Sequence, residues 1–277
     1  MKTLDKHTLI YDEECPLCEA YTSQFIKRGL LDKEGRTAYQ TMDFDKYPFI
    51  DKKLAANKIV LLNTQTGETN YGIDSLLKVL SYRYKFIGTI SRFKWVHIFL
   101  TLLYQFISYN RKVVAPAAIN NKQVCEPSNS ITWRVLFIAF NAVLVHVIVT
   151  WYFKTFLSQY MHSGIHIPDV VLFVAQIVFQ GIVFIALKQT NFYDYAGQLS
   201  FTAFLGALLL GLLGVGLVLL SYFGIQIELL ATVSYGIVYM FMFYEHWRRV
   251  GLYRWSKYLC VSWMIFRLLI YPLVFIY

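Results

Sequence analysis

Two closely spaced cysteines, Cys15 and Cys18, are the residues of this sequence best suited to chemistry. Thiol–disulfide exchange needs an accessible thiolate that attacks and a second thiol close enough to release the mixed disulfide. A C-x-x-C pair at a helix start supplies both. We expect Cys15 to be the exposed attacking residue, because the N-terminal end of a helix stabilises a thiolate. Cys18, one turn further, is expected to be the buried resolving thiol.

Three acidic residues, Asp12, Glu13 and Glu14, directly precede the first cysteine. Asp12 lies three residues before the attacking sulfur, where a carboxylate can accept or return a proton. All three charges oppose ionisation of Cys15. We therefore expect a thiol that is less acidic, and a couple that is more reducing, than in strongly oxidising C-x-x-C proteins.

A C-x-x-C pair is also half of many zinc sites, and this alternative stays open together with that of an inert pair. A zinc site needs two more ligands. The N-terminal part of the chain offers only His7, His97 and Cys125, at no recognisable spacing. We therefore favour redox chemistry, with no metal and no cofactor.

The elements around the cysteines alternate between strand and helix signals. Residues 8–11 form a β-prone run, and Pro16 then opens a helical stretch, 17–27, that stops at Gly29. The further expected elements are a strand at 36–42, an irregular or helical stretch through residue 56, strands at 58–63 and 69–71, and a helix at 73–82. The order β-α-β-α-β-β-α is that of the thioredoxin fold.

The string Tyr11-Asp12-Glu13-Glu14-Cys15-Pro16-Leu17-Cys18 resembles the DCC family of thiol-disulfide oxidoreductase-like proteins, which is named for the Asp and the two Cys. Segments 71–75 and 104–111 also resemble that family's pattern, so the resemblance covers about residues 6–115. It implies an α/β thioredoxin-like domain over residues 1–115 and a redox function. The sequence departs from thioredoxin-like proteins at 55–57, Ala-Ala-Asn, where they usually place a cis-proline, so we do not expect the usual mode of substrate docking.

Composition indicates a membrane protein. Hydrophobic residues make up 57% of the chain and charged residues 16%, which excludes a disordered chain and a nucleic-acid-binding tail. Residues 1–130 contain 18 of the 26 Lys and Arg residues and 13 of the 17 Asp and Glu residues. We therefore predict a soluble domain (1–115), a linker (116–130) and an all-α transmembrane bundle (131–277). The expected spans, each of roughly the ~20 residues that cross a bilayer, are 131–153, 169–187, 199–223, 225–244 and 258–277.

Positive charges predict the orientation of these spans. The basic stretch 248–257 favours the cytoplasmic side, and with five spans it lies on the same side as the N-terminal domain. The C-terminus then faces the opposite side. Residues 95–109 are apolar but too short to cross the bilayer, so they form either a helix at the membrane surface near anionic lipid or a buried helix of the domain.

Arg267 lies about halfway along the last predicted span, where an unpaired charge costs several kcal/mol. Asn141, Gln176 and Gln180 lie at comparable depths, and Glu228 is the nearest acidic candidate. These residues form either a substrate, quinone or proton site between helices or a structural polar clamp.

Three histidines in the same half of the chain offer a different chemistry. His146, His162 and His166 could hold a metal or a haem iron. Gly164 and Pro168 favour a loop around the last two, so we do not expect ligation.

The sequence thus predicts a multi-pass membrane protein whose cytoplasmic Cys15 and Cys18 perform thiol–disulfide exchange, with Asp12 assisting. Its expected partners are a protein or small-molecule thiol or disulfide, the lipid bilayer and another membrane subunit, with no nucleic acid. Two alternatives remain. One is a non-enzymatic membrane or transporter subunit with a partner-binding domain. The other is electron transfer between this domain and an intramembrane quinone or haem.

Overall fold

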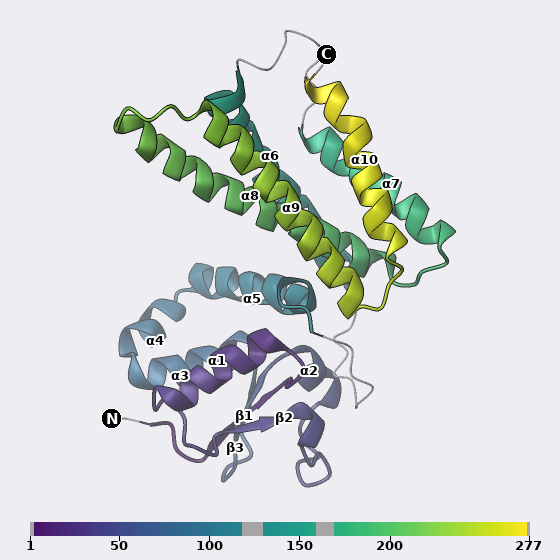
Figure 1. Cartoon of the computed structure of the whole chain (residues 1–277). Coiled ribbons are helices and arrows are strands. Elements are labelled where there is room, and N and C mark those ends of the chain that lie inside the picture. The colour runs from purple at the N-terminus through teal and green to yellow at the C-terminus, as the bar shows by residue number, and fades with distance from the viewer. Residues whose placement is uncertain (1–2, 118–129, 159–168, 276–277) are drawn as a thin grey trace. The chain divides into compact units, whose positions relative to one another are not determined.

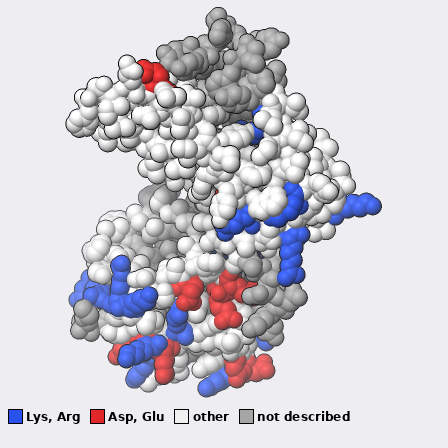
Figure 2. Space-filling view, in the orientation of Figure 1, with Lys and Arg blue, Asp and Glu red and all other residues white. Residues whose placement is uncertain are grey.

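The computed structural model describes residues 3–117, 130–158 and 169–275 (Figure 1). They divide into two compact units, Met1–Trp133 and Arg134–Tyr277, called below the N-terminal unit and the helical unit. On the face shown in Figure 2, acidic and basic side chains are interspersed over the N-terminal unit, whereas the helical unit is largely uncharged and most of its visible basic atoms gather at one end. The division of charge expected from the sequence is therefore present in the structure.

A mixed four-stranded sheet forms the centre of the N-terminal unit. The strands are β1 (His7–Tyr11), β2 (Arg36–Ala38), β3 (Val60–Asn63) and β4 (Thr69–Tyr71), in the order β2-β1-β3-β4. β1 runs parallel to β2 and antiparallel to β3, and β3 runs antiparallel to β4. Because both faces of β1 and β3 are covered, adjacent residues such as Leu9 and Ile10 are both buried.

Helices cover the two faces of this sheet. They are α1 (Pro16–Lys27), α2 (Lys52–Asn57), α3 (Ile73–Arg83), α4 (Lys85–Ser91) and α5 (Lys94–Val114). Leu9 and Leu61 pack with side chains of α1, α3 and α5, whereas Ile10 and Val60 pack with Ala55 of α2 on the other face. The predicted order of elements is therefore found.

One predicted strand is shorter than expected. The strand expected at 36–42 ends at Ala38, and a 3₁₀ turn, Tyr39–Thr41, replaces its second half. The reason is a polar contact, because this turn brings the amide of Gln40 within 2.8 Å of the Asp12 carboxylate.

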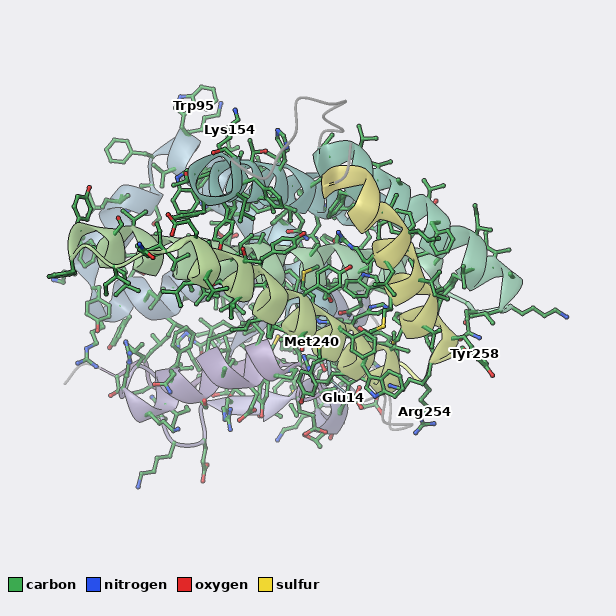
Figure 3. All side chains as sticks on the ribbon, turned by 45° about the horizontal axis from the view of Figure 1, so that its top comes forward. Glu14, Trp95, Lys154, Met240, Arg254 and Tyr258 are labelled. Carbon is green, nitrogen blue, oxygen red and sulfur yellow. The ribbon has the colours of Figure 1, made fainter. Side chains whose placement is uncertain are left out.

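Helix α5 is the last helix of the N-terminal unit and is longer than the predicted 95–109. One face packs against the unit through Tyr104, whereas Trp95 and Phe99 on the other face are 80% and 63% exposed. Trp95 points away from the ribbon (Figure 3). The helix therefore has one face buried in the domain and one exposed apolar face, and its place at a membrane surface stays a prediction.

The helical unit has helices at all five predicted spans. They are α6 (Ile131–Tyr152), which continues as a π-helical turn (Phe153–Leu157), α7 (Asp169–Ala186), α8 (Phe192–Tyr222), α9 (Glu228–Leu252) and α10 (Tyr258–Phe275). Among the described residues, Ile131–Leu157 and Phe192–Tyr222 are long and apolar enough to cross a membrane. A third candidate is the α4–α5 pair, if this pair, bent by 98°, counts as one span. Two to three such helices indicate membrane association, and the count of five spans stays a prediction.

Candidate active site

Local structure places Cys15 at the start of a helix. Strand β1 ends at Tyr11, and a tight turn follows in which the Cys15 N–H donates to the Asp12 carbonyl at 3.2 Å. Cys15 is the N-cap residue of α1, and Pro16 occupies the first turn, where its missing N–H costs nothing. The Cys18 N–H donates to Cys15 Sγ at 3.3 Å. The helix start thus holds the first sulfur over the second cysteine.

The two thiols differ in acidity. The pKa of Cys15 is lowered to about 7, chiefly by a hydrogen bond from the Cys18 thiol and further by the Cys18 N–H and the charge of Arg111, against burial and Asp12, which raise it. The pKa of Cys18 is raised, first by the same hydrogen bond with Cys15 and then by burial. Cys15 is therefore the thiol that ionises first, near neutral pH, while Cys18 keeps its proton.

One sequence-based expectation about Cys15, its exposure, is wrong. The residue is only 3% exposed, against the predicted exposure, because its sulfur turns inward to accept the Cys18 N–H. The expected opposition by nearby acids is present in the effect of Asp12 on the Cys15 pKa, but hydrogen bonds and Arg111 outweigh it.

Asp12 is buried and held by three donors. Its Oδ2 pairs with Arg111 Nη2 at 3.0 Å, and both side chains are almost fully buried. Its Oδ1 accepts hydrogen bonds from Gln40 Nε2 at 2.8 Å and from the Glu14 N–H at 3.2 Å. Charge-assisted hydrogen bonds of this kind fix both position and orientation. Asp12 is therefore an anchored carboxylate beside the cysteine turn.

Arg111 connects α5 to residues 55–57, the stretch in which thioredoxin-like proteins usually place a cis-proline. Its Nη1 donates to the Asn57 carbonyl at 3.3 Å and its Nη2 to the Ala56 carbonyl at 3.2 Å. No cis peptide bond occurs among the residues described. One guanidinium thus ties the end of α2 to Asp12 at the place that a cis-proline would occupy.

Sequence reasoning did not find this role of Arg111, although a signal was present. The helical spacing of Tyr104, Ser108 and Arg111 places them on one face of α5. All three side chains on this face hydrogen-bond to other parts of the N-terminal unit. A basic residue on the inner face of an amphipathic helix needs a buried acidic partner, and Asp12 is that partner.

A cavity of about 260 Å³ is lined by Cys18. Besides Cys18, the lining residues with polar side chains are Tyr11, Asp12, Tyr21, Lys58, Tyr104, Ser108 and Arg111. Burial raises the pKa of Tyr21 and of Tyr104, so both hydroxyls stay protonated at neutral pH. The cavity is mostly apolar elsewhere and suits a small ligand that needs a few hydrogen bonds.

The partners expected for Arg267 pair elsewhere. Asn141 Nδ2 donates to Ser200 Oγ at 3.1 Å, and Gln180 Oε1 accepts from the Tyr195 hydroxyl at 2.8 Å. Glu228 is exposed at the start of α9, and the buried amide of Gln176 has no partner among the described residues. Asn141 and Gln180 are thus hydrogen-bonded to α8, and no hydrogen bond joins them to Arg267 in the described part of the chain. A functional role of the polar residues around Arg267 stays a prediction.

A different polar network, missed from the sequence, links α6, α8 and α9. Arg134 Nη2 pairs with Asp194 Oδ1 at 2.9 Å, and Arg249 Nε pairs with Glu245 Oε1 at 2.7 Å. Gln198 lies between them and accepts a hydrogen bond from Arg249. Charged residues near the ends of apolar helices were the available signal. The network is a polar clamp of the kind expected for Arg267.

Three residues considered from the sequence, Cys125, His162 and His166, lie outside the described residues. His146 contacts Thr150 within α6. Within the described ranges, no group of three or more His, Cys, Asp or Glu side chains is placed to hold a metal ion. Cys260 is buried in the helical unit.

Comparison with known proteins connects this geometry to a chemistry. The family model of DCC1-like thiol-disulfide oxidoreductases matches residues 9–115. The matched stretch runs from β1 through α5 and so contains Asp12, both cysteines and Arg111. No curated protein and no solved structure matches the chain. The N-terminal unit is thus similar to a family to which a redox function is assigned.

Proposed function

We propose that the chain is a membrane-anchored thiol–disulfide oxidoreductase in which Cys15 attacks and Cys18 resolves. The observation that carries this proposal is the pair of hydrogen-bonded cysteines at the start of α1, one with a lowered and one with a raised pKa. The β2-β1-β3-β4 sheet, with one parallel and two antiparallel pairings, supports a thioredoxin-like fold around them. The family match supports the same chemistry.

In the reducing direction, the Cys15 thiolate attacks one sulfur of a substrate disulfide. The substrate S–S bond breaks, the released thiolate takes a proton from water, and Cys15 is left in a mixed disulfide. The Cys18 thiol then loses its proton and attacks Cys15 Sγ, which releases the second substrate thiol. Two electrons pass to the substrate, and the protein ends with a Cys15–Cys18 disulfide that an external dithiol reduces.

The hydrogen bond between the two cysteines orders these steps. While Cys15 is a thiolate, it raises the pKa of Cys18 and keeps that thiol protonated. When Cys15 becomes part of a mixed disulfide, its charge is lost, so the largest cause of the raised Cys18 pKa disappears. Cys18 is then free to ionise, and Asp12, which lines the same cavity, is the nearby carboxylate suited to accept its proton.

A reductase assay of the full chain tests this function. The reduced protein should reduce a fluorogenic glutathione disulfide, with an initial rate that rises as the pH increases through about 7, because the reactive thiolate forms above the Cys15 pKa. Cys15→Ser should lose the activity, whereas Cys260→Ser, which changes a buried cysteine of the helical unit, should retain it. A rate that rises only near pH 9, the ordinary pKa of a cysteine thiol, would count against the proposed thiolate.

Membrane contact by the N-terminal unit is supported by helix α5. Its exposed residues Trp95, Phe99 and Leu102 form an apolar face, and Lys94 and Lys112 lie at its two ends. Such a helix binds an interface that offers both hydrocarbon and anionic headgroups. We therefore propose that α5 lies at the surface of a lipid bilayer.

The proposed topology puts the N-terminal unit and the α9–α10 turn on the cytoplasmic side. Arg254 in this turn points outward (Figure 3) and is exposed, and Lys257 lies near it in the sequence. Basic residues of short loops favour that side. Reporter fusions at Lys33 and Gly251 should give the same cytoplasmic signal, because four spans separate them. Signals from opposite sides would overturn the five-span arrangement.

A further inference from the structure

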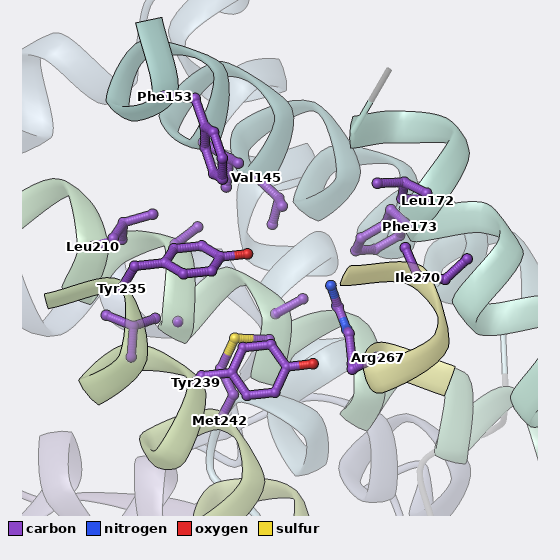
Figure 4. A pocket seen from close by; sticks show the side chains of 15 residues that line it. Val145, Phe153, Leu172, Phe173, Leu210, Tyr235, Tyr239, Met242, Arg267 and Ile270 are labelled. Carbon is purple, nitrogen blue, oxygen red and sulfur yellow. The ribbon is translucent and has the colours of Figure 1, made fainter. Parts of the chain in front are cut away.

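A partly open cavity of about 100 Å³ lies in the helical unit and is lined by residues from all five of its helices (Figure 4). Most of its wall is apolar, and Val145, Phe173 and Leu210 are typical of it. Three side chains bring polar groups to this space, namely Arg267 of α10 and Tyr235 and Tyr239 of α9. The guanidinium of Arg267 and the two hydroxyls point into the same space (Figure 4).

The charge of Arg267 is not compensated by the acidic side chains described in the helical unit. Asp194 pairs with Arg134, Glu245 pairs with Arg248 and Arg249, and Glu228 is exposed at the start of α9. Arg267 Nε is buried without a hydrogen-bond partner among the described residues, and the guanidinium lies 5.5 Å from the centre of the Trp263 ring. A cation–π contact offsets only part of the cost of burying a cation among apolar helices.

We propose that this cavity binds the carboxylate of an apolar acid, such as a single-chain fatty acid. The carboxylate would pair with the Arg267 guanidinium, whose donors match its two oxygens, and would accept hydrogen bonds from the tyrosine hydroxyls. The hydrocarbon chain would lie along the apolar wall. A neutral quinone would bring no negative charge to the Arg267 guanidinium.

Equilibrium dialysis of radiolabelled decanoate against the purified full chain in detergent tests this site. Wild-type protein should bind decanoate saturably, and Arg267→Gln should weaken the binding by at least about tenfold, because a charge-assisted hydrogen bond is lost. Arg254→Gln, which removes an exposed arginine, is the matched control and should bind like wild type. Tyr239→Phe should show a smaller loss. Arg267→Lys, which keeps the positive charge, should bind more tightly than Arg267→Gln.

Competition separates the head from the tail of the ligand. Unlabelled decanoate should displace the label, whereas decanol, which has the chain without the charge, and acetate, which has the charge without the chain, should not. Displacement by decanol as effective as by decanoate would overturn the role of Arg267, and equal displacement by acetate would overturn the apolar chain. Equal affinity of wild type, Arg267→Gln and Arg254→Gln would place decanoate outside this cavity. If Arg267→Gln does not fold, Arg267→Lys and Tyr239→Phe supply the comparison.

Discussion

Cys18→Ser should accumulate covalent partners on Cys15, whereas Cys15→Ser should accumulate none. Removing the resolving thiol leaves the first step intact, because the attacking thiolate still forms a mixed disulfide, but nothing releases it. The serine hydroxyl at position 18 can still donate to Cys15 Sγ, so part of the stabilisation of the thiolate is retained. Partners are detected as bands that disappear on reduction, after acid quenching and alkylation of cells that express the tagged full chain.

The control for this experiment is the double variant Cys15→Ser/Cys18→Ser, which should resemble Cys15→Ser. A zinc pair or an inert pair would give no adducts from any variant. Adducts that form with Cys15→Ser but not with Cys18→Ser would reverse the assigned order and make Cys18, which lines the cavity, the attacking residue.

Arg111→Met should destabilise the N-terminal unit more than any surface substitution. It leaves the Asp12 carboxylate buried without its cation, and breaking a buried pair in this way costs about 3–5 kcal/mol. It also removes the hydrogen bonds to Ala56 and Asn57. We expect the unfolding temperature of the unit to fall by more than about 10 °C. The reaction of Cys18, buried in the folded protein, with a thiol dye during heating measures this transition.

Two further variants separate charge compensation from loss of packing. Arg92→Met removes an exposed arginine and should change the unfolding free energy by less than about 0.5 kcal/mol. Asp12→Asn combined with Arg111→Met should recover part of the lost stability, because no uncompensated carboxylate remains. An Arg111→Met protein as stable as Arg92→Met would show that the buried ion pair is not needed for the fold.

Local patterns predicted the N-terminal elements because each has a local cause. Pro16 and Gly29 bound α1, and the turn before residue 69 separates β3 from β4. The strand at 36–42 was predicted too long because the contact that ends it, between Gln40 and Asp12, joins residues 28 positions apart. β-propensity does not contain such a contact.

Only the local part of the candidate site could be predicted from the sequence. The spacing of Cys15 and Cys18 is local, and their position at a helix start followed from it. The pairing of Asp12 with Arg111 could not be predicted in this way, because it joins residues 99 positions apart. In the helical unit, depth along each span was predicted, but the rotation of each helix was not. Asn141 and Gln180 therefore pair with α8 rather than with Arg267.

A redox titration tests directly whether Cys15 and Cys18 form one dithiol–disulfide couple. The full chain is equilibrated at a series of dithiol-to-disulfide ratios, quenched with acid and alkylated, and the modification of Cys15 and Cys18 is read by mass spectrometry. A Cys15–Cys18 redox couple predicts that both cysteines change together from alkylated to protected, with one midpoint and a two-electron slope, and that Cys260 stays outside the transition. Cys15 and Cys18 that remain alkylated at every ratio, or that titrate independently of each other, would contradict it.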